Sequence, residues 1–234
     1  VICCDGPNCW RKEVFPHYKA GRRKAREKSQ HDWSLIFNSL HKIRDEIADN
    51  MPYAVLRFER AEADDIIGAL CNAHGQHGIV TEKILIVSGD KDFVQLQKFD
   101  NVTQYSPIMK KFITADVNPE RFKQYHILQG DAGDGVPNIL SKDDVFMLGD
   151  RQKPVSSKRL QEFIDNGFIA CKNDEERRNW QRNVTLVDFK YIPDDIKEAI
   201  MQAYEVPVKG DKNAIMNYLI KNRCRNLLNE IEEF

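Results

Sequence analysis

The feature that most constrains the fold is a series of short apolar segments, each of which leads into acidic residues. VICC ends at Asp5, YAVLRF (53–58) leads into EADD (62–65), and ILIV (84–87) leads into the two aspartates of GDKD. Apolar runs of this length predict buried strands, and the helical patterns that separate them predict parallel βαβ units. Because ligand sites of open α/β sheets lie beyond the carboxyl ends of the strands, we expect these acids to converge.

Two helical patterns lie between these strands. Apolar residues recur every three or four positions over residues 32–48, which predicts an amphipathic helix. A second helix is expected to begin at Glu62, with acids in its first turn, where the helix dipole favours negative charge. VTQYS (102–106) and KKFIT (110–114) predict two short strands joined by a turn. We therefore expect an α/β fold with a mostly parallel central sheet flanked by helices.

The second half of the chain differs from the first. Helical patterns dominate from Pro119 onward, so we expect an α/β core over residues 1–117 and a helical region over residues 118–234. No apolar run reaches the roughly 18 residues of a membrane-spanning helix, so we expect no membrane association. The six cysteines form no CxxC pair. This usage predicts reduced thiols and a cytoplasmic protein.

Positive charge is concentrated near the N-terminus. Between Cys9 and Gln30 there are eight lysine and arginine residues but only two glutamates. A separated basic patch predicts a polyanionic partner. The alternative is an ordinary solvated face of a helix. The basic residues are Arg11, Lys12, Lys19, Arg22, Arg23, Lys24, Arg26 and Lys28.

A fourth acidic group, Asp131 and Asp134, lies in the glycine-rich turn GDAGDG. Each group alone has an ordinary alternative, such as helix N-terminal charge or a solvated turn. Together they predict a site for Mg²⁺ or Mn²⁺, because carboxylates about 5 Å apart repel by roughly 3 kcal/mol and a bound cation compensates that repulsion. Two ions about 3.5–4 Å apart would activate a water and stabilise the leaving oxygen in phosphodiester hydrolysis. The six histidines, His126 among them, lack ligand spacing and are assigned no role.

The combination of EADD, SGDKDF and GDxxD, preceded by DGPNCWRKEVFPHYKAGR, resembles the 5′-nuclease family. That family includes flap endonucleases, the 5′→3′ exonuclease domains of bacterial DNA polymerases and the ribonucleases H of T-even phages. The resemblance implies a PIN-like α/β fold with a helical arch over the site. It also implies 5′→3′ exonuclease and flap endonuclease activity on RNA or DNA of a duplex, with two Mg²⁺ ions for which Mn²⁺ can substitute. The implied setting is removal of RNA primers from lagging-strand fragments in a phage-infected bacterial cell.

The resemblance also implies roles for individual residues. Lys19, Arg22, Asp64 and Asp90 are expected to be catalytic. Metal ligands are expected at Asp5, Glu62, Asp64, Asp90, Asp92 and Asp134, with Asp65 and Asp131 orienting water or ligands around them. Nucleic-acid contacts are expected from Arg11, Lys12, Tyr18, Lys19, Arg22, Arg23, Lys24, Arg26, Lys28, Ser157 and Lys158. For Tyr18 the alternative to base stacking is core packing, and for Ser157 and Lys158 it is an ordinary helix cap.

The sequence departs from the family pattern in two ways. The family has a further metal-ligand Asp on a strand before the position of Asp5, so we expect one open position in the sheet and an incomplete metal site in this chain. The family's Gly-x-Gly hairpin is absent after Asp134. Two alternative functions therefore remain: a flap or duplex DNA-binding module without catalysis, and a PIN-like endoribonuclease. The family implies a monomer that works with a sliding clamp or a single-strand DNA-binding protein, and LLNEIEEF at the end either packs on the domain or recruits a partner.

Overall fold

The computed structural model describes residues 1–208 and 210–234, and the backbone but not the side chain of Lys24. The strands are β1 (Ile2–Cys4), β2 (Val55–Arg57), β3 (Ile84–Val87), β4 (Val102–Ser106) and β5 (Lys111–Ile113). The α-helices are α1 (Arg11–Val14), α2 (Ala20–Glu27), α3 (Trp33–Asn50), α4 (Ala63–His74), α5 (Pro119–Gln129), α6 (Val145–Leu148), α7 (Ser157–Asn166), α8 (Asp174–Val187), α9 (Asp194–Tyr204), α10 (Lys212–Lys221) and α11 (Arg225–Leu228). The 3₁₀ helices are η1 (Lys91–Lys98), η2 (Gly167–Ala170), η3 (Phe189–Tyr191) and η4 (Ile231–Glu233).

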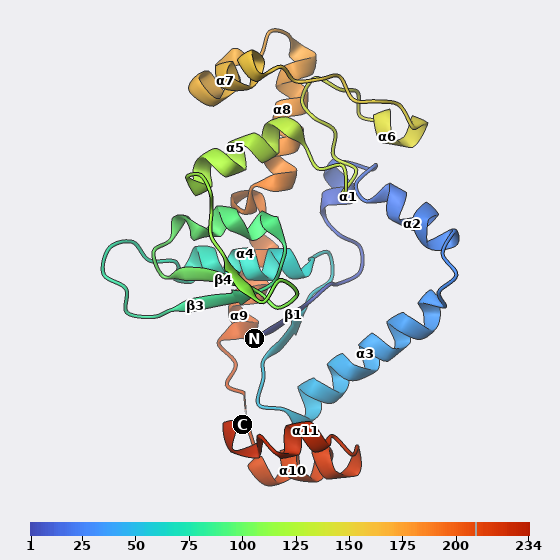
Figure 1. The fold of residues 1–234 in the computed structure, drawn as a ribbon, viewed down its shortest axis with the longest axis vertical. Coiled ribbons are helices and arrows are strands. Elements are labelled where there is room, and N and C mark those ends of the chain that lie inside the picture. Colours follow the sequence, from blue (N-terminus) through green and yellow to red (C-terminus); the bar gives the residue numbers. More distant parts are fainter. Residues whose placement is uncertain (209) are drawn as a thin grey trace.

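The strands form two small sheets rather than one (Figure 1). β1 and β2 pair in parallel, with Cys3 opposite Leu56. β3 and β4 also pair in parallel, with Ile86 opposite Gln104, and β5 pairs with β4 in the antiparallel sense. The α/β class and the parallel pairing are therefore confirmed, but the expected central sheet is divided in two.

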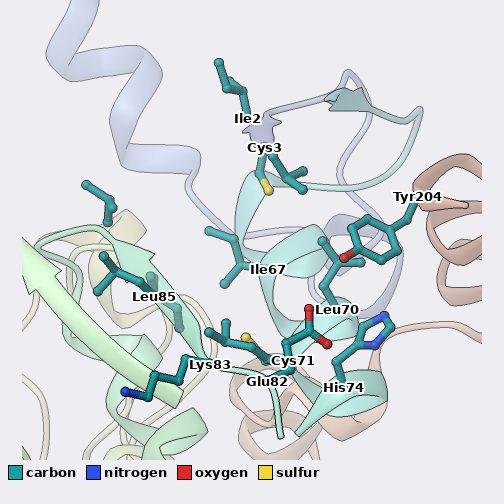
Figure 2. A pocket seen from close by; sticks show the side chains of 14 residues that line it. Ile2, Cys3, Ile67, Leu70, Cys71, His74, Glu82, Lys83, Leu85 and Tyr204 are labelled. Carbon is teal, nitrogen blue, oxygen red and sulfur yellow. The ribbon is translucent and has the colours of Figure 1, made fainter. Parts of the chain in front are cut away.

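An apolar pocket of about 590 Å³ lies between the two sheets. Figure 2 shows its lining, to which β1 and β3 contribute from the two sheets and α4 contributes Ile67, Leu70 and Cys71. Leu85 and Val87 of β3 are 54% and 63% exposed, although a parallel strand inside a sheet normally has both faces covered. Among the described residues β1 pairs only with β2 and β3 only with β4. The two sheets therefore share no strand-to-strand hydrogen bonds in the part of the chain that the structure describes.

Helix α4 lies at the centre of the main core. Its residues Ile66 and Ala69 are buried in one cluster with Phe93 of η1 and Phe189 of η3. Gly68 allows the close approach of that last ring, because a Cβ at this position would lie 2.7 Å from the Phe189 side chain. The packing fixes the helix on several sides. The acidic residues at its N-terminus are therefore held on a rigid element.

Helix α3 confirms the predicted helix but not the burial of its apolar face. The Asp32 carboxylate caps the helix by accepting a hydrogen bond from the Leu35 N–H at 3.0 Å. None of the helix's own residues is buried, and Phe37, Leu40 and Ile43 are exposed. Figure 1 shows the reason: α2 and α3 form a limb along one side of the molecule, apart from both sheets. The spacing of apolar residues thus predicted the helix correctly, and the structure adds that much of its apolar face lies at the surface.

The C-terminal region is helical, as expected, and contributes to two small cores. One contains Leu128 of α5 and Phe163 of α7. The other contains Leu219 of α10 and Met51, which directly follows α3, and Phe234 packs against it. The segment LLNEIEEF therefore packs on the rest of the chain. Among the described residues, every helix is too short or too polar to cross a bilayer.

Candidate active site

Four segments carry the predicted acids. They are the end of β1 (Asp5), the start of α4 (Glu62, Asp64, Asp65), the turn after β3 (Asp90, Asp92) and the turn after α5 (Asp131, Asp134). The Asp5 carboxylate accepts a hydrogen bond from the Ala63 N–H at 2.8 Å, which joins the first segment to the second. In the fourth segment, Gly130 has φ +67°, and a Cβ there would lie 2.3 Å from the Val136 carbonyl oxygen. The tight turn that presents these aspartates therefore requires glycine at its start.

Asp65 organises the start of α4 from within the protein. Its carboxylate accepts hydrogen bonds from the Glu62 N–H at 2.8 Å and from the Trp10 indole at 3.2 Å. A second oxygen lies 2.8 Å from the Arg11 guanidinium. Together with Glu62 it forms a capping box, in which each side chain satisfies an otherwise unpaired backbone N–H. Asp65 is fully buried, so it positions its neighbours and does not face a ligand.

Cations neutralise one half of the acidic site. The Lys19 ammonium lies 2.6 Å from Glu62 and 3.5 Å from Asp134, and the Arg22 guanidinium lies 2.5 Å from Asp134. The Tyr18 hydroxyl donates toward the same two carboxylates, at 2.9 Å from each. Burial by itself raises the pKa of Glu62, but Lys19 and Arg11 more than offset it and hold that pKa below its ordinary value. Glu62 is therefore ionised and paired in this half of the site.

Lys19 is held in a strained backbone conformation. Its φ of +55° lies in the left-handed region, which is unfavourable for a residue with a side chain. The Lys19 N–H donates to the Asp134 carbonyl oxygen at 2.7 Å, which links α2 to the acidic turn after α5. Strain of this kind is concentrated at functional sites, where the surrounding structure maintains it. The backbone thus places the ammonium between two carboxylates from different segments.

The other half of the site has an excess of negative charge. Burial raises the pKa of Asp64 to about 7, and the nearby charge of Asp90 adds to this effect. Burial also raises the pKa of Asp92 to about 6, with His126 opposing the rise and Asp90 reinforcing it. A cavity of about 20 Å³ lies among Asp64, Asp92, Asp131 and Asp134. A polar cavity of this size is large enough for one water or ion.

The half of the site around Asp64 and Asp92 has the residues and the space to hold a divalent cation. One oxygen of Asp92 is buried without a hydrogen-bond partner. Leaving such an oxygen unpaired is costly unless a ligand satisfies it. Carboxylate oxygens are the ligands that hard divalent ions prefer, and an ion would also lower the raised pKa values of the buried acids. Four of the eight predicted acids, Asp64, Asp92, Asp131 and Asp134, therefore line a space that suits a metal ion, whereas Asp5, Glu62, Asp65 and Asp90 are not in its lining.

Two of the predicted nucleic-acid contacts are corrected. Arg11 is 4% exposed; its guanidinium pairs with Glu62 and Asp65 and donates to the Leu186 carbonyl oxygen at 2.9 Å. Tyr18 is also 4% exposed, and its ring lies in a hydrophobic cluster. A buried guanidinium cannot reach a phosphate and a buried ring cannot stack on a base. Both residues instead support the acids from inside.

Lys19 is largely buried beside Glu62, but seven of the other predicted contacts lie at the surface. Of the predicted contacts on and beside α1 and α2, the exposed ones are Lys12, Arg22, Arg23, Arg26 and Lys28. The side chain of Lys24, which belongs to the same prediction, lies outside the described part. Ser157 and Lys158 are exposed at the start of α7, where the Ser156 hydroxyl caps the helix by accepting from the Arg159 N–H. Arg22, near the start of α2, pairs with Asp134, whereas Ser157 and Lys158 lie at the start of α7, a separate helix (Figure 1).

Sequence reasoning missed two residues of the site. His126, in the last turn of α5, lies between Asp92 and Asp131 and lines the cavity. Lys91 lies 3.4 Å from Asp131. The only signal for His126 was its position five residues before Asp131, which is not a ligand spacing within a helix. Its role depends on the turn at Gly130, which reverses the chain after α5.

Comparisons with known proteins show which family the chain belongs to. The family profile "5′-3′ exonuclease, N-terminal resolvase-like domain" matches residues 1–126, and "T4 RNase H, C terminal" matches residues 118–234. The chain is 35% identical over 246 residues to ribonuclease H of Enterobacteria phage T4, which covers all of this chain and 78% of that protein. It is 30% identical over 158 residues to the flap endonuclease Xni of Shewanella sediminis, covering 63% of this chain and 57% of that one.

Solved structures show the same fold. A variant of the bacteriophage T5 flap endonuclease, in a pseudo-enzyme-product complex with DNA and metal ions, matches with a TM-score of 0.56 at 16% identity. The match covers 98% of this chain and 82% of the T5 protein. At this identity the likeness establishes the fold, while the sequence profiles establish the family. The chain belongs to the 5′-3′ exonuclease family, with a resolvase-like N-terminal domain and a C-terminal domain of the T4 ribonuclease H type.

Proposed function

We propose that this chain is a divalent-metal-dependent 5′→3′ exonuclease and flap endonuclease. It would hydrolyse phosphodiester bonds of RNA or DNA near a 5′ end on duplex or branched DNA, and remove RNA primers during lagging-strand replication. The observation that supports this most strongly is the cavity lined by Asp64, Asp92, Asp131 and Asp134, with the cations of Lys19 and Arg22 beside it. The names of the T4 and Shewanella relatives point to the same activities.

The proposed cofactor is a pair of Mg²⁺ ions, for which Mn²⁺ can substitute. When bound, such ions activate a water for attack and neutralise charge on the phosphodiester. Asp65 would orient Glu62 through the capping box, and Asp131 would orient ligands from the opposite side of the cavity. The proposed metal ligands are Asp5, Glu62, Asp64, Asp90, Asp92 and Asp134.

Lys19 and Arg22 have a second role in this proposal. Both cations now pair with carboxylates that would bind the metal ions. When ions neutralise those carboxylates, the ammonium and the guanidinium become available to the phosphate of the substrate. Charge-assisted hydrogen bonds of this kind stabilise the negative charge that develops on phosphate oxygens during hydrolysis. Arg22 is half exposed, so it reaches the substrate with little rearrangement.

Cleavage of a 5′ flap tests the proposed function. The full chain is incubated with a 5′-labelled flap on a nicked duplex, with the matching RNA–DNA hybrid and with unstructured single-stranded RNA. Short labelled products from the flap and the hybrid, with Mg²⁺ and not with chelator, are the expected result. Salt-sensitive binding without cleavage would instead identify a DNA-binding module. Preferential cleavage of unstructured RNA would identify an endoribonuclease of the PIN type.

The exposed basic residues of α2 should contribute to binding without contributing to chemistry. We expect the Arg26→Ala/Lys28→Ala double variant to bind flap DNA more weakly at every salt concentration and to reduce the slope of log K against log salt by about 1.5, because each phosphate contact releases a counterion. Fluorescence anisotropy across a salt series measures this slope. Lys221→Ala, which removes an exposed lysine from α10, serves as the control and should leave the slope unchanged. Equal slopes for all three proteins would remove α2 from the binding surface.

The remaining expectations are proposals on the same basis. We propose the division of the chain at residues 117 and 118, nucleic-acid contacts from Lys12, Arg23, Lys24, Ser157 and Lys158, and a monomeric enzyme in the cytoplasm of an infected bacterial cell. A sliding clamp or a single-strand DNA-binding protein is the proposed replication partner. Limited proteolysis would test the division, and size-exclusion chromatography with light scattering would test the monomer.

A further inference from the structure

We propose that His126 is a metal ligand, which together with Asp92 and Asp131 forms a nitrogen-containing cation site that prefers Mn²⁺, Co²⁺ or Zn²⁺ to Mg²⁺. The proposal rests on the metal-dependent function above, makes Asp131 a direct ligand in place of the orienting role given there, and concerns which ion this chain selects. One ligand atom from each of the three side chains lies within 4.8 Å of the others. All three side chains line the cavity among the acids.

The histidine is buried and faces the acids. His126 is 8% exposed, so more than nine-tenths of it is covered. Its Nε2 lies 3.4 Å from an Asp131 oxygen, and its Nδ1 lies 3.7 Å from an Asp92 oxygen. Both separations exceed the roughly 2.7–3.2 Å of an N–H···O hydrogen bond. Accordingly, Nε2 and that same Asp92 oxygen are buried without a hydrogen-bond partner.

The spacing suits two ligands of one ion better than a hydrogen bond. A nitrogen and an oxygen that each lie about 2.1 Å from a tetrahedral ion are about 3.4 Å apart. Nε2 and the Asp131 oxygen are separated by this distance. An ion between them would satisfy the imidazole nitrogen and the carboxylate together. It would also lie in the cavity that the orphaned polar atoms border.

The surrounding charges leave this position in need of a cation. On the other side of the site, Lys19 pairs with Glu62 and Arg22 pairs with Asp134. The Lys91 ammonium lies 3.4 Å from Asp131, and its side chain is 60% exposed, so water weakens its effect. Among the described residues, the His126 imidazole is the basic group that comes within ion-pair distance of Asp92, at 3.7 Å, while Lys91 acts on that carboxylate from farther away. The alternative is that a protonated His126 fills this need by itself.

Ligand chemistry determines which ion the site prefers. Mg²⁺ prefers oxygen ligands in octahedral geometry and keeps much of its water. Imidazole nitrogen suits transition ions, and divalent affinity rises from Mn²⁺ through Co²⁺. A site of two carboxylates and one imidazole therefore favours these ions over Mg²⁺. The cation site formed by His126, Asp92 and Asp131 would then differ in its ion preference from a site elsewhere among the acids whose ligands are all oxygen atoms.

Metal binding to the full chain tests the proposal. Mn²⁺ affinity is measured from the electron paramagnetic resonance signal of the free ion, Co²⁺ from its visible absorption and Mg²⁺ by calorimetry. We expect His126→Gln to weaken Mn²⁺ and Co²⁺ binding by about ten- to a hundredfold, as for loss of a group that holds a metal, and to change Mg²⁺ binding less than about twofold. His74→Gln is the matched control, because its Nε2 is also buried and unpartnered but lines the apolar pocket between the sheets.

A measurement on the unaltered chain keeps the test independent of how the variant folds. Pulsed electron paramagnetic resonance of bound Mn²⁺ should show ¹⁴N coupling from a directly bound imidazole. Bound Mn²⁺ without ¹⁴N coupling, with equal affinity in His126→Gln, would overturn the proposal and indicate an imidazolium that only pairs with the acids. The proposed nuclease function would still be supported after that result if Mg²⁺-dependent cleavage is seen. Failure of the unaltered chain to bind any of the three ions would overturn both.

Discussion

Asp64→Asn should lose cleavage and gain stability at the same time. Asp64 lies at the start of α4, and burial together with Asp90 raises its pKa from 3.8 to about 7. As a proposed metal ligand, it should be needed for hydrolysis, so cleavage should fall by about a thousandfold. The amide of asparagine has the same shape and no charge. It should therefore relieve the cost of keeping an ionised carboxylate buried beside other acids in the metal-free protein.

The sign of the stability effect follows from proton linkage. The folded pKa is above the unfolded value, so the folded protein binds this proton more tightly. Stability of the unaltered chain should then decrease as the pH rises from about 4 to about 7, and the full penalty should remain above pH 7. The helix dipole offsets only about 0.3–1 kcal/mol of this penalty, because Asp64 is an acid in the first turn of α4. We expect Asp64→Asn to melt at a higher temperature than the unaltered chain at pH 8 without metal.

Metal ions should reverse the order of the melting temperatures of Asp64→Asn and the unaltered chain. Mg²⁺ should raise the melting temperature of the unaltered chain, because a ligand that binds only the folded state stabilises it. Asp64→Asn should show a much smaller rise. Thermal unfolding at several pH values, with Mg²⁺ and with chelator, measures both effects. Asp194→Asn, an exposed first-turn acid of α9, is the control and should leave cleavage unchanged. Retained cleavage in Asp64→Asn would contradict the metal assignment, and a lower melting temperature would contradict the burial argument.

Gly6→Ala should prevent the chain from folding normally. A Cβ at this position would lie 1.6 Å from the Phe58 carbonyl oxygen and 2.9 Å from the Ala61 carbonyl oxygen. Both obstacles are backbone atoms, so no side-chain rotation relieves the clash. The Gly6 N–H also donates to the Ala61 carbonyl oxygen at 2.8 Å. Any shift would separate the end of β1 from the start of α4, where Asp5 binds the Ala63 N–H.

We expect Gly6→Ala to lower the free energy of unfolding by more than about 4 kcal/mol, which is at the extreme for a single substitution. For a chain of this size it corresponds to a fall of at least about 8–16 °C in melting temperature. Circular dichroism during heating measures it, and a missing cooperative transition would be the most severe form of the result. Gly21→Ala is the matched control, because nothing lies within 4 Å of a Cβ there and alanine favours the α2 helix. A melting temperature for Gly6→Ala within 2 °C or so of the unaltered chain would show that this close backbone approach is wrong.

The sequence by itself indicated the class of the fold and four acids that line one cavity, Asp64, Asp92, Asp131 and Asp134. Asp5 and Asp90, which follow strands directly, are not in the lining of that cavity. The apolar spacing of residues 32–48, a local signal, located α3 correctly. These predictions depend on covalent order and local preference, which a sequence states directly.

Only the tertiary structure decided how these parts face one another. Arg11 and Tyr18 resemble surface groups of a basic segment, yet the fold buries both beneath Glu62. The apolar face of α3 remains exposed because the limb that carries it extends away from both sheets. His126 has no ligand spacing, and it joins the acids only because the chain reverses at Gly130. Burial, ion pairing and contacts across the chain depend on which segments fold against one another, and residue spacing alone does not specify that choice.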